Sequence, residues 1–158
     1  MKHKTKYQVI VVGAGHAGVE ASLAAARCGS RVALVTLTGN SIARMSCNPS
    51  IGGLAKGQIV REIDALGGVM GVAADFSGIQ FKMLNKSKGR AVWSPRAQVD
   101  KRKYEKYVNK RILKDPLIDL IEAEVVSTVI TKGKISGVKT IDNSIISGEA
   151  VVLTNGTF

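Results

Sequence analysis

Short apolar runs, glycine turns and amphipathic segments follow one another along the first part of the chain. Residues 8–12 are mostly apolar and β-branched and end at Gly13, which is typical of a buried parallel strand. Residues 17–28 have helical spacing, and residues 32–35 form a second apolar run. This succession predicts a βαβ unit over residues 8–35, with a right-handed crossover.

The predicted helix carries a stripe of small residues. A stripe of this kind lets a helix lie close to a sheet, so we expect it to face the core and to bury Cys28. Its members are Ala17, Ala21, Ala24, Ala25 and Cys28.

A polar, glycine-rich loop is predicted over residues 36–57, and loops of this length in compact domains are usually functional. A helix over residues 57–66, a second short helix and a strand at 79–84 are expected to follow. A basic helix is predicted over about residues 97–114 and ends before Pro116. Its buried side is marked by Tyr104, Val108 and Ile112.

The last part of the chain reads as β structure. After a strand at 118–121, alternating segments predict an antiparallel β-meander over about residues 124–147, with its last strand at 144–146. Residues 150–154 return to the apolar pattern of a buried parallel strand. The whole pattern predicts an α/β fold of one domain, with a parallel sheet, helices and an antiparallel meander. Because the chain stops just after a strand, we expect a truncated domain.

Composition narrows the class of protein. No stretch approaches the ~20 apolar residues that span a bilayer, so we expect a cytoplasmic protein without a membrane segment. The two cysteines, Cys28 and Cys47, lie in no CxxC pair, which argues against a disulfide scaffold and predicts no metal site.

The net charge of +11 is concentrated in one segment. Residues 82–114 hold twelve of the 23 Lys and Arg residues but two of the 12 acids, Asp100 and Glu105. A basic block on an otherwise balanced chain indicates either a polyanion-binding surface or a solvated helix face.

The motif Gly13-x-Gly15-x-x-Gly18 lies where a strand passes into a helix, the context that a dinucleotide-binding turn requires. Gly13 permits the tight turn, Gly15 lets a pyrophosphate approach the backbone, and Gly18 lets helix and strand pack closely. The acid that binds ribose at the end of the second strand is missing, and Thr36 stands there. This weakens a simple NAD assignment, and the meander favours a flavoprotein with a Rossmann-like FAD-binding domain.

Several further motifs occur together and in order: Ser46-Cys-Asn-Pro-Ser-Ile-Gly-Gly53, Glu62-Ile-Asp-Ala-Leu-Gly-Gly68, Arg96-Ala-Gln98 and Val151-Val-Leu-Thr-x-Gly-Thr-Phe158. With the glycine turn, they resemble the N-terminal part of the GidA/MnmG family of tRNA uridine-modifying flavoproteins over the whole chain. The family also has Thr rather than an acid at the end of the second strand. Relatives are several times longer, so the resemblance implies a fragment that is inactive alone.

The resemblance implies a reaction and its partners. Such proteins work with the GTPase MnmE to add an aminomethyl or carboxymethylaminomethyl group at C5 of the wobble uridine in tRNA. FAD is reduced by NADH, whose site lies outside this chain, and the carbon comes from methylenetetrahydrofolate. The full-length protein is expected to be a homodimer.

The resemblance also implies roles for particular residues. The FAD site takes Gly13, Ala14, Gly15, His16, Ala17 and Gly18 at the pyrophosphate and Val125 at the adenine end. Cys47 is the candidate nucleophile toward uracil C6, or else a residue that shapes the flavin pocket, with a backbone nest formed by Asn48, Pro49, Gly52 and Gly53. The tRNA phosphates are expected on the basic helix and beside it, at Arg96, Lys101, Arg102, Lys103, Lys106, Lys110 and Arg111.

Two departures from the family lie in the segment next to this helix. Arg90 stands where relatives commonly have Pro, and Trp93-Ser94-Pro95 replaces a more basic stretch.

Two other functions remain open from the sequence. A generic FAD/NAD(P)H oxidoreductase of a small molecule is one, although the redox-active CxxC that would favour it is missing. A non-catalytic nucleic-acid-binding module is the other, and it would bind in a strongly salt-dependent way without any flavin.

Overall fold

The computed structural model describes residues 6–39 and 42–156 and divides the chain into two compact units. The first unit comprises residues 1–43 and 111–158, and the second comprises residues 44–110. The second unit is inserted into the sequence of the first. Each unit has a sheet of its own.

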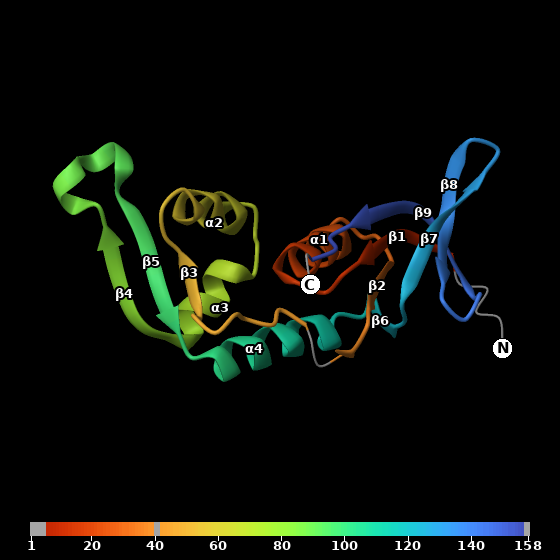
Figure 1. Ribbon diagram of the computed structural model, residues 1–158, viewed down its shortest axis with the longest axis horizontal. Coiled ribbons are helices and arrows are strands. Elements are labelled where there is room, and N and C mark those ends of the chain that lie inside the picture. The colour runs from red at the N-terminus through yellow and green to blue at the C-terminus, as the bar shows by residue number, and fades with distance from the viewer. Residues whose placement is uncertain (1–5, 40–41, 157–158) are drawn as a thin grey trace. The chain divides into compact units, whose positions relative to one another are not determined.

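The first unit contains a six-stranded sheet in the order β6-β2-β1-β9-β8-β7, with helix α1 beside β1 (Figure 1). Neighbours from β6 to β9 pair in parallel, whereas β9, β8 and β7 pair antiparallel. This confirms the predicted Rossmann-like fold class. The elements are β1 Tyr7–Val12, α1 His16–Arg27, β2 Val32–Thr36, β6 Ile118–Glu122, β7 Val125–Thr131, β8 Lys134–Thr140 and β9 Ile145–Leu153.

The centre of this sheet forms the core of the first unit. Ile10, Val11, Val32, Ala33 and Leu34 are all fully buried. Consecutive residues of a strand point to opposite faces, so burial of each one means that both faces are covered. The apolar runs of the sequence are explained by this position.

Strand β9 is one continuous element where the sequence predicted two. Residues 145–147 pair antiparallel with β8, and residues 148–153 pair in parallel with β1. The separation of a strand at 144–146 from a returning strand at 150–154 is therefore wrong. The two parts form one strand because β9 lies between β8 and β1 in the sheet, so each part has a neighbouring strand to pair with.

Helix α1 buries a different face from the predicted one. Val19, Ser22, Leu23 and Ala26 are buried, and Cys28 is exposed. The larger apolar side chains at positions i, i+4 and i+7 select this face, since they bury more apolar area than a stripe of alanines. The prediction that Cys28 lies in the core is wrong.

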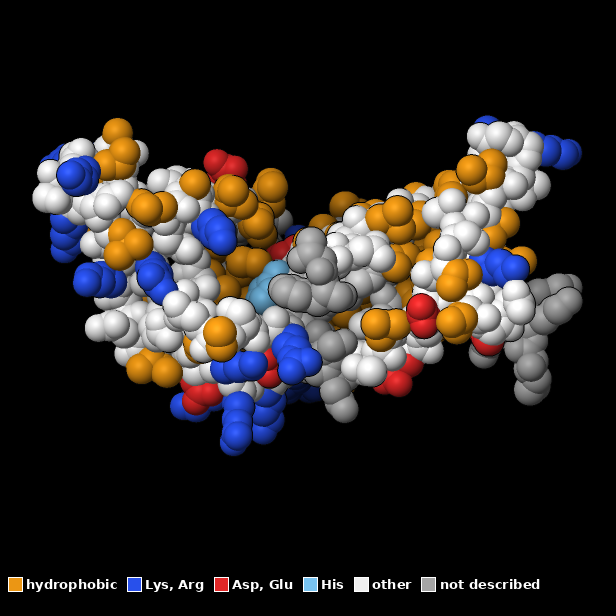
Figure 2. Space-filling view, viewed as in Figure 1, with side chains coloured by type: hydrophobic (Ala, Val, Ile, Leu, Met, Phe, Trp, Pro, Cys, Tyr) orange, Lys and Arg blue, Asp and Glu red, His pale blue; other side chains and the backbone are white. Residues whose placement is uncertain are grey.

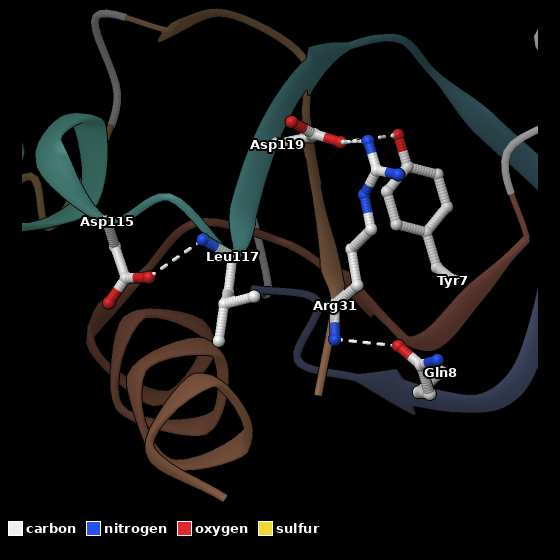
Figure 3. Close-up of polar contacts among 6 residues, drawn as sticks. All are labelled: Tyr7, Gln8, Arg31, Asp115, Leu117 and Asp119. Atoms are coloured by element: carbon white, nitrogen blue, oxygen red, sulfur yellow. Dashed lines mark hydrogen bonds and ion pairs between the residues drawn. The ribbon is translucent and has the colours of Figure 1, made fainter. Parts of the chain in front are cut away.

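A polar cluster joins three strands of the first unit near their amino ends (Figure 3). The Tyr7 hydroxyl donates to Asp119 Oδ2 at 3.0 Å, and Arg31 Nη2 lies 3.0 Å from the same oxygen. The Arg31 guanidinium also lies over the Tyr7 ring, 5.5 Å from its centroid. Burial, followed by the hydrogen bond to Asp119 and its charge, raises the pKa of the Tyr7 hydroxyl.

The second unit contains a three-stranded antiparallel sheet in the order β3-β5-β4 (Figure 1). Its first strand lies inside the segment predicted as loop 36–57, because residues 50–52 find partners in β5. Two single 3₁₀ turns lie between β4 and β5. The elements are β3 Ser50–Gly52, α2 Lys56–Ala65, α3 Met70–Ser77, β4 Gly78–Leu84, η2 Lys86–Lys88, η3 Arg90–Val92 and β5 Ser94–Val99.

The basic helix α4 covers Lys101–Lys114 and so starts later than the predicted residue 97. The preceding residues are held in β5 by β3 on one side and β4 on the other. Asp100 then caps the helix, since its Oδ1 accepts the N–H groups of Arg102 at 2.9 Å and Lys103 at 3.1 Å. The predicted buried side is confirmed, with Tyr104, Val108 and Ile112 each at most 1% exposed.

Candidate cofactor-binding site

The glycine turn lies at the carboxyl end of β1, the edge at which open α/β sheets bind ligands. Gly13 has φ of +101°, a conformation that L side chains rarely adopt, and its N–H donates to the Val35 carbonyl at 2.8 Å. Gly15 precedes the first residue of α1 and no side chain caps this end of the helix. The first N–H groups of an α-helix have no partner within the helix and point out of its end.

Gly15 and Gly18 differ in the space around them. A Cβ on Gly18 would overlap the Gly13 carbonyl oxygen and lie 2.8 Å from Thr154 Oγ1. A Cβ on Gly15 would meet no atom within 4 Å. Gly18 is thus needed for packing within the chain, whereas the missing side chain of Gly15 leaves open space in front of the helix end. A phosphate group fits such a position, since backbone N–H groups and the helix dipole both favour an anion there.

Thr154 fixes this turn from the neighbouring strand. Its hydroxyl donates to the carbonyl oxygens of Val12 at 2.9 Å and Gly13 at 3.0 Å. Its N–H also donates to Val12 O at 2.9 Å. The sequence analysis assigned no role to Thr154, and the signal that could have indicated one is a Thr directly after the returning strand.

The other predicted residues of the turn lie in two environments. Ala14 is buried, and its carbonyl accepts the Ala43 N–H at 2.8 Å. His16 is half-buried at the first position of α1, and Ala17 is exposed.

Val125 lies at the start of β7, next to the carboxyl ends of β2 and β6. Ala123 N–H donates to Thr36 O at 2.9 Å, which holds the chain against β2 just before β7 begins. An acid does occupy this edge: Glu122 is in register with Thr36 on the neighbouring strand. Its Oε1 accepts the N–H of Gly39 at 2.7 Å and so shapes the loop after β2. Glu122 was not predicted at this edge, because it lies 86 positions after Thr36 in the sequence.

Cys47 is exposed in a turn of the second unit. The N–H groups of Ser50 and Gly53 donate to the carbonyls of Asn48 at 2.9 Å and Pro95 at 2.8 Å. Of the residues expected to form the nest around the thiol, Gly53 therefore has a main-chain acceptor for its N–H, and Pro49 has no N–H to offer. The Ser46 hydroxyl donates to Asn48 O at 3.3 Å and tightens the same turn.

The predicted phosphate-binding residues fall into two groups. Arg96 belongs to β5 rather than to the basic helix, and its Nη2 donates to Ser50 Oγ at 3.1 Å. The others lie on α4, where Lys101 is half-buried. Lys and Arg side chains gather over α4 and over the hairpin of β4 and β5 (Figure 2). The exposed cations of α4 are Arg102, Lys103, Lys106, Lys110, Arg111 and Lys114.

A cavity of about 420 Å³ lies within the second unit. Its lining combines apolar side chains of the sheet, such as Phe81 and Met83, with Arg61 and Asp64 of α2 and Asp75 of α3. Its volume is within the range of sites for small molecules.

Among residues 6–39 and 42–156, no group of three or more His, Cys, Asp or Glu side chains lies close enough to hold a metal ion. No helix in these ranges is long and apolar enough to cross a membrane.

Comparison with known proteins gives the family. Residues 8–158 match the family described as glucose inhibited division protein A. The tRNA uridine 5-carboxymethylaminomethyl modification enzyme MnmG of Endomicrobium trichonymphae is 52% identical over 153 residues, which are 97% of this chain and 26% of that protein. The chain thus spans about a quarter of the length of the relatives it matches.

Solved structures agree with this assignment. The crystal structure of Aquifex aeolicus GidA has a TM-score of 0.93 and 50% identity, covering 98% of this chain and 26% of that one. A probable FAD-dependent monooxygenase from Pseudomonas aeruginosa shares the fold alone, with a TM-score of 0.62 and 14% identity over 93% of this chain and 42% of that one. The chain belongs to the glucose inhibited division protein A family.

Proposed function

We propose that the complete protein carrying this chain is an FAD-dependent enzyme that modifies C5 of the wobble uridine in tRNA, and that this chain binds the FAD pyrophosphate. The observation that carries the proposal is the open space at Gly15, beside the closed packing at Gly18, in a chain whose relatives are named as tRNA uridine-modifying enzymes. The fold shared with a probable FAD-dependent monooxygenase supports FAD as the dinucleotide.

The turn residues have separate parts in this proposal. Gly13 and Thr154 hold the backbone, Gly15 leaves room for the pyrophosphate, and the N–H groups at the start of α1 bind its oxygens. Ala14, His16, Ala17 and Gly18 complete the turn, and the backbone at Val125 is proposed for the adenine end. When bound, FAD supplies the redox chemistry that links a one-carbon donor to the uridine.

The remaining parts of the reaction rest on the family resemblance. We propose NADH as the reductant, methylenetetrahydrofolate as the carbon donor, an MnmE-type GTPase as partner and a homodimer as the assembly. Cys47 is proposed to add to C6 of the uracil, which makes C5 nucleophilic. Its exposure in the turn leaves the thiol accessible to a substrate.

The exposed cations of α4 are proposed to bind tRNA phosphates. Arg102, Lys106 and Lys110 follow at four-residue intervals and so share one side of the helix. Phosphate contacts of this type add affinity without reading the sequence.

The function is tested by analysing tRNA nucleosides after deletion of the gene. Loss of the modified wobble uridine is expected, and unchanged modification would refute the function. The FAD site is tested separately with Gly15→Val in the complete protein. The Cβ of the new side chain meets no atom within 4 Å, so we expect the variant to fold and to purify without flavin absorbance. Ala24→Leu, an exposed position farther along α1, is the matched control and should retain flavin.

Cys47→Ser separates the two roles of the cysteine. A nucleophile predicts that the variant keeps its flavin and loses turnover. Loss of flavin would instead assign Cys47 to shaping the flavin pocket.

A further inference from the structure

The hairpin formed by β4, the two 3₁₀ turns and β5 is basic along its whole length. Residues 78–99 contain five Lys or Arg residues and no acid. Among the described residues, the ion pairs are Lys6–Glu149 and Arg31–Asp119, and neither involves these side chains. We call Lys82, Lys86, Lys88, Arg90, Trp93 and Arg96 the hairpin surface.

Two cations of the hairpin surface lie directly opposite each other. Lys82 of β4 is in register with Arg96 of β5. Like charges directly opposite each other destabilise a sheet, and this pair lines the same cavity as Asp64 and Asp75. An anion bound between or beside them would relieve this cost.

The end of the hairpin is organised around an aromatic ring. The Trp93 indole N–H donates to Lys86 O at 3.2 Å, and the Arg90 guanidinium lies 5.8 Å from the centroid of the Trp93 ring. Backbone hydrogen bonds close both turns, from Lys88 N to Asn85 O and from Trp93 N to Arg90 O. The ring is therefore fixed before any partner binds, yet 38% of Trp93 stays exposed.

This combination fits RNA that is not base-paired. Unpaired bases stack on aromatic rings and on Arg guanidinium planes, while Lys and Arg neutralise the backbone. The same strands also border the cavity lined by Phe81 and Met83, which offers an apolar space next to the cations. A base-paired helix keeps its bases stacked inside and would use the charges alone.

We propose that the hairpin surface binds an unpaired segment of the substrate RNA, with one base stacked on Trp93 and the phosphates on its Lys and Arg residues. The inference rests on the proposed function, because that function supplies RNA as the substrate. It adds a second RNA-binding element to α4, one that distinguishes unpaired from paired RNA.

Trp93 is the chain's single tryptophan, so its fluorescence reports directly on this contact. The purified chain is titrated with a stem–loop RNA that has a seven-nucleotide loop, with a fully paired duplex of equal length, and with poly-glutamate. We expect the loop RNA to quench the emission strongly, and the duplex and the peptide to leave it nearly unchanged. Quenching by the peptide to the same extent would overturn the proposal in favour of an acidic protein partner.

Variants test the same contact by affinity. Trp93→Ala should weaken loop RNA binding about tenfold and duplex binding less than about twofold, as expected for one lost base stack. Trp93→Phe should recover most of the loss, and circular dichroism checks that both variants are folded. Lys86→Ala with Lys88→Ala should reduce the salt slope of loop binding by about 1.4. The matched control is Lys134→Ala with Lys139→Ala on β8, which should leave loop and duplex binding in the same ratio.

The failures are distinguishable. If loop RNA binds without quenching the fluorescence, and Trp93→Ala binds it with unchanged affinity, the hairpin surface does not bind the RNA. The proposed function is not affected by that result. Unchanged wobble uridine after gene deletion overturns the proposed function itself.

Discussion

The glycine turn of the first unit and the hairpin of the second unit offer positive charge to an anion by different means. At the turn, Gly15 has no side chain and the charge comes from backbone N–H groups at a helix end. At the hairpin, five cationic side chains supply the charge and a fixed indole ring supplies a surface. A backbone site recognises one rigid group closely, whereas a side-chain site adapts to a flexible chain. The difference fits the two proposals, a bound cofactor in the first unit and an RNA segment on the second.

The largest expected effect separates the two glycines that look alike in the motif. Gly18→Ala should lower the free energy of unfolding by about 3 kcal/mol, because its Cβ would overlap the Gly13 carbonyl oxygen. Gly15→Ala should change it by less than about 0.5 kcal/mol, since its Cβ meets open space. Urea unfolding of both variants measures the difference. Equal losses would contradict the division between a packing glycine and a ligand-facing glycine.

A second, smaller effect is expected at the residue that fixes the turn. Thr154→Val removes the hydroxyl donor to Val12 O and Gly13 O and should destabilise the chain by about 1–1.5 kcal/mol. Thr154→Ser keeps the hydroxyl and serves as the control in the same urea experiment. If Ser and Val cost the same, packing of the methyl group and not the hydrogen bond holds the turn.

A third effect concerns the strand ends opposite the turn. Because the fold raises the pKa of Tyr7 above its ordinary value near 10, it favours the protonated hydroxyl. Its contribution to stability is full below pH 10 and is lost as the pH rises through the raised pKa. Unfolding at pH 8 and at pH 11 should show this loss in the natural sequence. Tyr7→Phe should be about 1 kcal/mol less stable at pH 8 and should lack this part of the pH dependence.

The smallest effect tests whether α4 acts as a charged surface alone. Lys106→Ala with Lys110→Ala should weaken binding of loop and duplex RNA by the same factor and reduce each salt slope by 1 to 2 units, on the order of one unit per lost phosphate contact. Fluorescence anisotropy at several salt concentrations measures both. A selective loss of loop binding would place the recognition of unpaired RNA on α4 and not on the hairpin.

The two regions also differ in how far their structure could be predicted from the sequence. Although Val35 and Thr154 also hold the turn, its glycines lie close together in the sequence, so the apolar run before Gly13 and the glycine spacing were sufficient to place it. The hairpin depends on partners that are distant in sequence. Residues 97–99 were assigned to a helix because their partners in β3 and β4 gave no local signal. Asp100 was a local signal, because Asp is a common N-cap residue, and it would have placed the start of the helix at Lys101.

Similar reasons explain the other differences. The last two strands were predicted as separate because the pattern of apolar residues changes there from alternating to continuous. In the structure this change marks the point at which one strand, β9, passes from pairing with β8 to pairing with β1. The acid at the carboxyl edge was sought after β2 and lies instead at the end of β6, where Glu122 is opposite Thr36.

The pairing of β9 with β1 has a consequence for how the chain is made. Strand β1 leaves the ribosome first but cannot complete its sheet until residues 148–153 have been synthesised. The second unit, residues 44–110, is continuous in sequence and has all its partners long before that. We expect it to fold during synthesis while the first unit waits, since contacts distant in sequence form slowly. The glycine turn acquires its last hydrogen bonds only when Thr154 has been synthesised, so the proposed cofactor site is completed after the second unit has its partners.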